Sequence, residues 1–101
     1  SCGTEKSVVL RGLMVAAWDR KTKPASILIA RGADLTMATE DYKNTALMLA
    51  AGSGSMRIVT ELLEHSADKH IKDYIGQTAE DHASHHRHYD VASFIRNYRG
   101  Y

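Results

Sequence analysis

Apolar residues recur along the chain with the period of short helices. Four of them, just before a Gly-Ser-Gly-Ser tract at 52–55, predict one short apolar helix: Leu47, Leu49, Ala50 and Ala51. Thr45 stands directly before this stretch, where its hydroxyl can cap the first turn. After the tract, a second set follows one stripe of an amphipathic helix: Ile58, Val59, Leu62 and Leu63. The pattern predicts two short helices joined by a tight turn.

This helix pair is repeated along the chain. Sliding the sequence by 33 residues places 40–46 over 73–79, and a slide of 34 places 66–68 over 32–34. A period of this length indicates a repeat architecture, in which each unit buries its apolar face against a neighbour. We expect a single domain over residues 1–101, built of units at about 6–39, 40–72 and 73–101.

Residues that begin and end helices stand at matching places in the units. Pro24 lies in the first turn of a predicted helix, where its missing N–H costs little, and Gly32 is placed to end that helix in a left-handed conformation. Thr78 and Asp81 have the spacing of a capping box. The predicted fold class is all-α, with helix-turn-helix units joined by polar connectors.

The units resemble ankyrin repeats. The resemblance rests on residues 73–79 (Asp-x-x-Gly-x-Thr-Ala), 45–51 (Thr-Ala-Leu-Met-Leu-Ala-Ala), 58–63 (Ile-Val-x-x-Leu-Leu) and 32–34 (Gly-Ala-Asp), and it covers nearly the whole chain in phase. It implies an ankyrin-repeat solenoid of stacked helix-turn-helix units with short β-turn connectors.

Five positions depart from the family pattern. Alanine replaces the usual proline at 46 and 79, Met48 and Asp81 stand where the family has histidine, and Lys43 replaces the turn glycine. We expect Met48, Asp81 and Lys43 to alter local turn hydrogen bonds rather than the fold.

The two ends of the array differ in polarity. Four apolar positions of the middle unit are polar in the last one: Leu47 becomes Glu80, Leu49 becomes His82, Ala51 becomes Ser84 and Leu63 becomes Arg96. A terminal unit shows one broad face to water, so we expect the array to end here. At the other end, the dense apolar residues at 8–10 and 13–15 are either a self-contained starting cap or a surface for a preceding repeat, in which case the chain is excised from a longer protein.

Composition narrows the possible partners. The chain has 13 Lys or Arg, 12 Asp or Glu and a net charge of +1, which argues against nucleic acid or an anionic membrane as a partner. One cysteine, Cys2, precludes an internal disulfide and favours an intracellular location, cytoplasmic or nuclear. We expect a monomer or a part of a larger chain.

Six histidines raise the question of a metal site, because four lie within seven residues: His82, His85, His86 and His88. His82 and His86 have the i, i+4 spacing that lets two imidazoles reach one zinc ion. In the repeat register, however, His82 points inward and His85 and His86 lie on an exposed edge. We therefore expect surface or cap histidines and no cofactor, with a weak metal site as the alternative.

No sequence motif indicates an enzyme. The tract at 52–55 lacks the Gly-Lys-Ser/Thr ending of a phosphate loop, and no Gly-x-Ser-x-Gly element is present to expose a nucleophile. We expect no enzymatic activity.

The resemblance instead implies partner binding on a concave face. In this family, the positions after the turn aspartate and at the end of each first helix project onto that face. Carried onto this chain, they give these candidates: Trp18, Asp19, Asp41, Tyr42, Asn44, Ser53, Tyr74, Ile75, Gln77, His85 and His86. Gly52 and Ser53 are expected to leave a shallow depression, and Asp19 and Asp41 favour a partner segment containing Lys or Arg.

Trp and Tyr are the residues that most often anchor protein interfaces. The competing interpretation is structural: Trp18 folds back over the 21–23 loop, and the tyrosines pack along neighbouring connectors. The sequence thus predicts a protein-protein interaction module that binds a partner segment. The alternatives are a structural cap of a larger multidomain protein and a weak metal protein built on 82–88.

Overall fold

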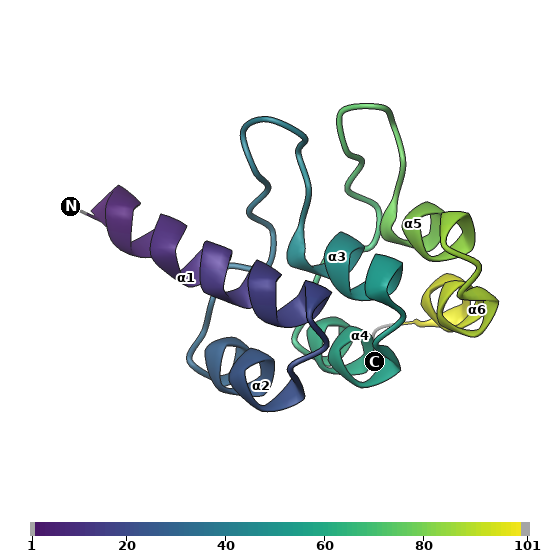
Figure 1. The fold of residues 1–101 in the computed structure, drawn as a ribbon, viewed down its shortest axis with the longest axis horizontal. Helices are drawn as coiled ribbons and strands as arrows, with labels where there is room; N and C mark the ends of the chain where they lie inside the picture. Colours follow the sequence, from purple (N-terminus) through teal and green to yellow (C-terminus); the bar gives the residue numbers. More distant parts are fainter. Residues whose placement is uncertain (1, 100–101) are drawn as a thin grey trace.

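The computed structural model describes residues 2–99, with side chains from Val8 onward, as a stack of three helix pairs (Figure 1). The pairs are α1 (Cys2–Trp18) with α2 (Thr22–Ala30), α3 (Ala46–Ser53) with α4 (Met56–Glu64), and α5 (Ala79–His85) with α6 (Tyr89–Asn97). No strand occurs in this range, which confirms the all-α prediction. The predicted end of the third unit at 101 and the side chain of Cys2 lie outside the described part.

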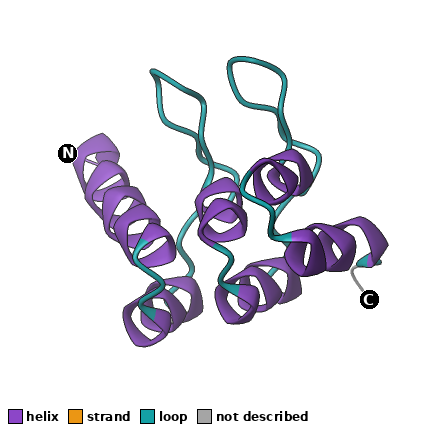
Figure 2. Cartoon of the chain, turned by 45° about the vertical axis from the view of Figure 1, so that its right-hand side comes forward, coloured by secondary structure: helices purple, strands orange, loops and turns teal. Residues whose placement is uncertain are grey.

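The helices form two layers, α1, α3 and α5 in the inner layer and α2, α4 and α6 in the outer one. Two long connectors extend on the same side beyond the inner layer (Figure 2). We call them the first finger (residues 36–45) and the second finger (residues 69–78). Successive inner helices pack on one another, as do successive outer helices.

Small residues bring the inner helices close together. Five alanines of these helices are buried in the core: Ala16, Ala17, Ala50, Ala51 and Ala83. Larger apolar side chains fill the space between the layers; the largest fully buried ones are Leu13, Leu47, Met48, Ile58, Leu62 and Ile95. The buried side chains of all three helix pairs contact one another, so the stack has one continuous core.

Both predicted caps form despite the departures from the family pattern. The Oγ1 atom of Thr45 accepts a hydrogen bond from the Met48 amide at 3.3 Å, and the Thr45 amide donates to the Met48 sulfur at 3.4 Å. The Thr78 amide donates to the Asp81 carboxylate at 3.0 Å, and the Asp81 amide donates back to the Thr78 hydroxyl at 3.4 Å. Methionine and aspartate thus complete the reciprocal cap.

Two helices, α2 and α3, end at glycines that the sequence marked, with one difference in position. Gly32 follows α2 with φ +84°, as predicted. The chain break at 52–55 begins later than the tract suggests, because α3 runs through Gly52 and Ser53 and is capped by Gly54, whose φ is +77°. A left-handed residue at this point satisfies the last helical carbonyls.

The backbone hydrogen bonds that close the two fingers do not join the residues that the 33-residue alignment pairs. In the second finger, Asp73 donates its amide to the Gln77 carbonyl at 2.9 Å and accepts the Gly76 amide at 3.0 Å. In the first finger, Thr39 makes the matching bonds with Asn44 at 3.0 Å and Lys43 at 3.0 Å. The turn between Thr39 and Asn44 therefore holds one residue more than the turn between Asp73 and Gln77, and Thr39 rather than Glu40 corresponds to Asp73.

The outward face of the third helix pair is polar, as expected. The Arg96 guanidinium on α6 donates to the Glu80 carboxylate on α5 at 2.8 Å. These two residues replace leucines of the second pair, and their ion pair joins the helices across a face that meets water.

Lys69 holds the end of α6. Its ammonium donates hydrogen bonds to the carbonyl oxygens of Ile95 at 2.8 Å, Arg96 at 3.1 Å and Tyr98 at 2.7 Å. These carbonyls lie at or just beyond the negative end of the α6 dipole, where a cation is favoured, and the Ile95 carbonyl also accepts the Tyr98 amide at 3.3 Å.

We expect Lys69→Met to lower the free energy of unfolding by about 1–2 kcal/mol, because charge-assisted hydrogen bonds to the α6 carbonyls are lost. Urea denaturation of the variant and of Lys72→Met, a matched change at an exposed position, measures this difference. Equal stability of the two variants would contradict the capping role.

Candidate partner-binding site

The end of the inner layer carries a cluster of three residues, one from each helix pair: Trp18, Gly52 and His86. The Trp18 and His86 rings meet edge to face with centroids 6.0 Å apart. A Cβ atom placed on Gly52 would lie 3.3 Å from the indole and 3.4 Å from the His86 ring. The absence of a side chain at Gly52 therefore lets the two rings close over α3. We call this group the helix-end cluster.

The predicted depression at Gly52 and Ser53 is wrong, because these rings lie over Gly52 and bury it. The Ser53 hydroxyl faces the carbonyl oxygens of Ala17 at 2.9 Å and Ala50 at 3.0 Å. It ties the end of α3 to α1 and shares its one proton between these two acceptors.

Trp18 nevertheless remains accessible. Its side chain is 49% exposed at the last position of α1. The indole packs on His86 of the third repeat, across the intervening helix, while one part of its surface faces solvent. His85 adds a further ring at 5.5 Å from His86, perpendicular to it.

A second aromatic group lies on the fingers. The Tyr42 and Tyr74 rings meet with centroids 5.3 Å apart, and the Tyr74 amide donates to the Tyr42 carbonyl at 3.0 Å. Tyr42 is 53%, Tyr74 61% and Ile75 60% exposed. We call these three residues the finger cluster. The tyrosines pack on each other, as the structural interpretation expected, and still present most of their surface to solvent.

The remaining candidates surround these clusters. Asp41 is exposed and accepts the Tyr42 amide at 2.7 Å. That hydrogen bond, together with one from the Thr39 hydroxyl, lowers the pKa of Asp41 below 3.8. Asp19 is exposed just after α1. Both residues are thus open to solvent.

Asn44 and Gln77 lie at the bases of the fingers and are half-buried. The Asn44 amide donates to the Thr39 hydroxyl at 3.1 Å, and the Gln77 amide donates to Asp73 Oδ1 at 2.8 Å. Their backbones close the fingers and thereby set the positions of the tyrosines.

The residue pair that sequence reasoning missed is Asp73 with His82. His82 Nε2 lies 2.8 Å from Asp73 Oδ2, and Asp73 Oδ1 accepts the amides of Ile75 at 3.1 Å and Gln77 at 2.8 Å. Burial alone would raise the pKa of Asp73, but these hydrogen bonds and the His82 ring outweigh it and hold the pKa below 3.8. This carboxylate fixes the second finger onto α5.

The four clustered histidines diverge. His82 faces Asp73, His86 faces Trp18, and the His88 ring lies over Gly54, where an added Cβ would come within 2.7 Å of it. Among the described residues, no three His, Cys, Asp or Glu side chains are placed to hold one metal ion. The structure thus gives these histidine rings separate neighbours, and the alternative of a weak metal site at 82–88 stays a prediction.

The structure thus sorts the aromatic candidates into two clusters. Eight-residue α3 runs from Ala46, at the base of the first finger, to Ser53, directly after Gly52, a rise of about 12 Å. Partner contacts at both clusters would have to span the inner layer.

Three in-phase helix pairs with connectors on one side define a repeat protein of stacked helix-turn-helix units. The chain matches the family description "Ankyrin repeats (3 copies)" over residues 13–100. It belongs to the ankyrin-repeat family, as the resemblance of its motifs indicated.

Two relatives share part of the chain. It is 43% identical over 56 residues to "Probable E3 ubiquitin-protein ligase XBOS33" of Oryza sativa subsp. japonica, covering 55% of this chain and 11% of that protein. It is 31% identical over 88 residues to "Ankyrin repeat and SAM domain-containing protein 6" of Danio rerio, covering 87% of this chain and 12% of that protein. The chain therefore corresponds to a small part of each relative.

The described helices include none with the length and apolar character needed to cross a bilayer.

The contact between Trp18 and His86 makes the state of the histidine measurable. Desolvation lowers the pKa of His86 below 6.5, and the neighbouring His85, His82 and His88 lower it further. The folded chain thus favours the neutral ring, and this contribution to stability is lost as pH falls from 6.5 through the lowered pKa.

Trp18 is the single tryptophan, and a protonated imidazole in contact with an indole quenches its emission. We expect Trp18 fluorescence to fall on acidification with a midpoint below pH 6.5, and His86→Gln to remove this transition. A midpoint at or above 6.5, or an unchanged transition in the variant, would show that His86 is not the group sensed.

We expect Asp73→Asn to lower the free energy of unfolding by about 2 kcal/mol at pH 7, because the buried anion accepts three hydrogen bonds. The pKa of Asp73 is lowered on folding, so its contribution is present above the unfolded pKa and is lost as pH falls through the folded one. The difference from the parent chain should therefore shrink below about pH 4. Urea denaturation from pH 3 to 7 measures it. Asp90→Asn, at an exposed position, serves as the control, and an equal loss in that variant would refute the assignment.

Proposed function

We propose that this chain is a protein-protein interaction module that holds a segment of a partner protein on its concave face. The proposal rests chiefly on one observation: the finger cluster keeps Tyr42, Tyr74 and Ile75 more than half exposed on the connectors. Large apolar groups held in place at an exposed site are typical of protein interfaces rather than of a solvated surface.

The fold adds rigidity to this surface. Tyr74 is fixed by its ring contact and amide bond to Tyr42, and the second finger is anchored to α5 through Asp73 and His82. A preorganised surface loses little conformational freedom on binding, so more of the contact energy appears as affinity.

The partner segment is expected to carry a Lys or Arg near an apolar side chain. Asp41 lies beside Tyr42, and its lowered pKa keeps it ionised at neutral pH. Asp19 follows Trp18 at the other cluster. An exposed carboxylate next to an aromatic ring suits a long basic side chain, whose stem packs on the ring while its head meets the acid.

Ankyrin repeats are generally binding modules without chemistry of their own, and we propose no enzymatic activity. The match to the rice protein lies in 56 residues, and the word ligase in its name belongs to that whole protein.

The test is a variant with Trp18→Ala, Tyr42→Ala and Tyr74→Ala. We expect it to lose the proteins that the parent chain captures from a lysate, identified by mass spectrometry, with a melting temperature within about 3 °C of the parent because all three side chains are about half exposed or more.

Tyr89→Ala provides the control, since Tyr89 is 65% exposed on the outer helix α6. It should leave capture unchanged. Retained binding in the triple variant would refute the proposal, whereas a large fall in its melting temperature would assign the rings to packing.

A further inference from the structure

The two broad ends of the stack are chemically different. Positions that face the following repeat can be recognised by comparing units: Leu13 and Leu47 are fully buried, and the equivalent residue of the third repeat is Glu80. Ile29 and Leu63 are likewise buried, and their equivalent is Arg96. At this end, the apolar residues are replaced by an ion pair, which suits contact with water.

Positions that face the preceding repeat show the opposite behaviour. Ala46 and Ala79 are buried, while the equivalent Gly12 is exposed; Leu62 and Ile95 are buried, while the equivalent Leu28 is only partly so. Ala33 is likewise less buried than its equivalent Ala67. The first repeat differs from the others in having no helix pair before it among the described residues, and these positions open for that reason.

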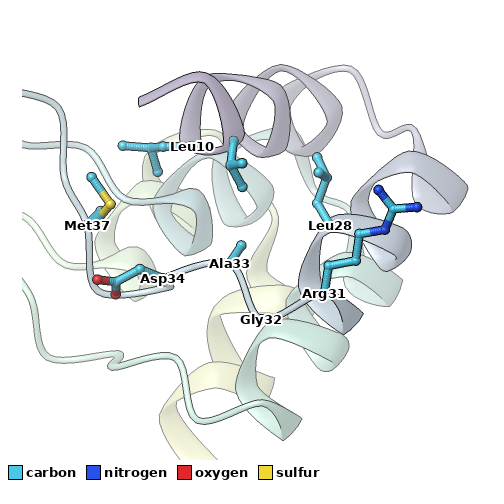
Figure 3. Close-up of a pocket in the computed structure, with 8 residues that line it drawn as sticks. Leu10, Leu28, Arg31, Gly32, Ala33, Asp34 and Met37 are labelled. Atoms are coloured by element: carbon cyan, nitrogen blue, oxygen red, sulfur yellow. The ribbon is translucent and has the colours of Figure 1, made fainter. Parts of the chain in front are cut away.

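The residues at this open end have stayed apolar. Val9, Leu10, Leu28, Ala33 and Met37 line a groove between α1, α2 and the connector, with Arg31 and Asp34 at its rim (Figure 3). A Cβ atom on Gly12 would lie 3.5 Å from Leu28, which places Gly12 beside the same groove. Val8, 66% exposed, extends the apolar surface along α1.

We propose that this face, centred on Gly12, Leu28 and Ala33, is an inter-repeat surface that accepts another helix-turn-helix unit in the register of the stack. The argument is continuity with the interfaces already present: the same positions are covered by a helix pair at both of the internal junctions. A terminal face that is not covered is expected to be polar, as the Glu80 and Arg96 face is. The conclusion does not depend on the proposed function of the concave face.

The test adds the missing neighbour. The chain's own residues 40–78 replace residues 1–11 in front of Gly12, which keeps the repeat register. The fusion therefore lacks Val9 and Leu10, and the open positions that the added unit would cover are Gly12, Leu28 and Ala33. In the added copy, the residues corresponding to Leu47 and Leu63 would cover Gly12 and Leu28, as they now cover the third repeat. We expect the melting temperature to exceed that of the 1–101 chain by more than about 5 °C, because stability in a repeat array grows with each well-packed junction.

The matched control carries Leu47→Glu and Leu63→Arg in the added copy alone, which gives it the polar face of the third repeat. We expect this addition to bring at most a small gain. Equal melting temperatures for the two additions, or no gain from the first, would overturn the proposal.

Two measurements on the 1–101 chain guard against a misfolded fusion. Leu28→Arg should shift its melting temperature by less than about 2 °C, whereas Leu62→Arg, at the equivalent covered position, should prevent cooperative folding. Light scattering should find a monomer. A dimer that Leu28→Arg dissociates would assign the face to a second copy of the chain and overturn the proposal. A Leu28→Arg variant as unstable as Leu62→Arg would also overturn it, because Leu28 would then be part of the packed core.

Discussion

The close approach of α1, α3 and α5 is the constraint on which the rest of the structure depends. Alanines at 16–17, 50–51 and 83 keep these contacts short and are fully or nearly fully buried, so the three helix ends lie near enough for Trp18 to meet His86 over Gly52. The same spacing brings the two fingers close enough for the Tyr74 amide to donate a hydrogen bond to the Tyr42 carbonyl. Larger side chains in the inner layer would separate both clusters as well as the core.

The sequence predicted best what is decided locally. Thr45 and Thr78 cap helices through atoms three residues away, and Gly32 ends α2 through its own φ, so spacing alone was sufficient. The inward direction of His82 followed from the repeat register. The contact of His82 with Asp73 did not, because the slide by 33 aligned Asp73 with Glu40. The longer turn between Thr39 and Asn44 becomes visible only in the hydrogen bonds of Thr39.

The helix-end cluster was beyond sequence reasoning for a different reason. Trp18 and His86 were both expected on one face, but their contact depends on the absence of a side chain at Gly52, a residue that a sequence presents simply as flexible. The polar end of the stack was predicted because four positions change together. The fate of the opposite end stayed open in the sequence, since an apolar surface has the same composition whether it is covered or free.

The turns of this stack adopt left-handed backbone whether or not glycine is present. Lys43 has φ +58° where the second finger has Gly76 at +86°, and Arg20 and Arg87 have φ +61° and +65° at the positions that correspond to Gly54. The architecture imposes the conformation, at roughly 1 kcal/mol for each residue that carries a Cβ. Natural variation can therefore change the charge of these turns without changing their path, and their surface chemistry is free to diverge while the solenoid stays the same.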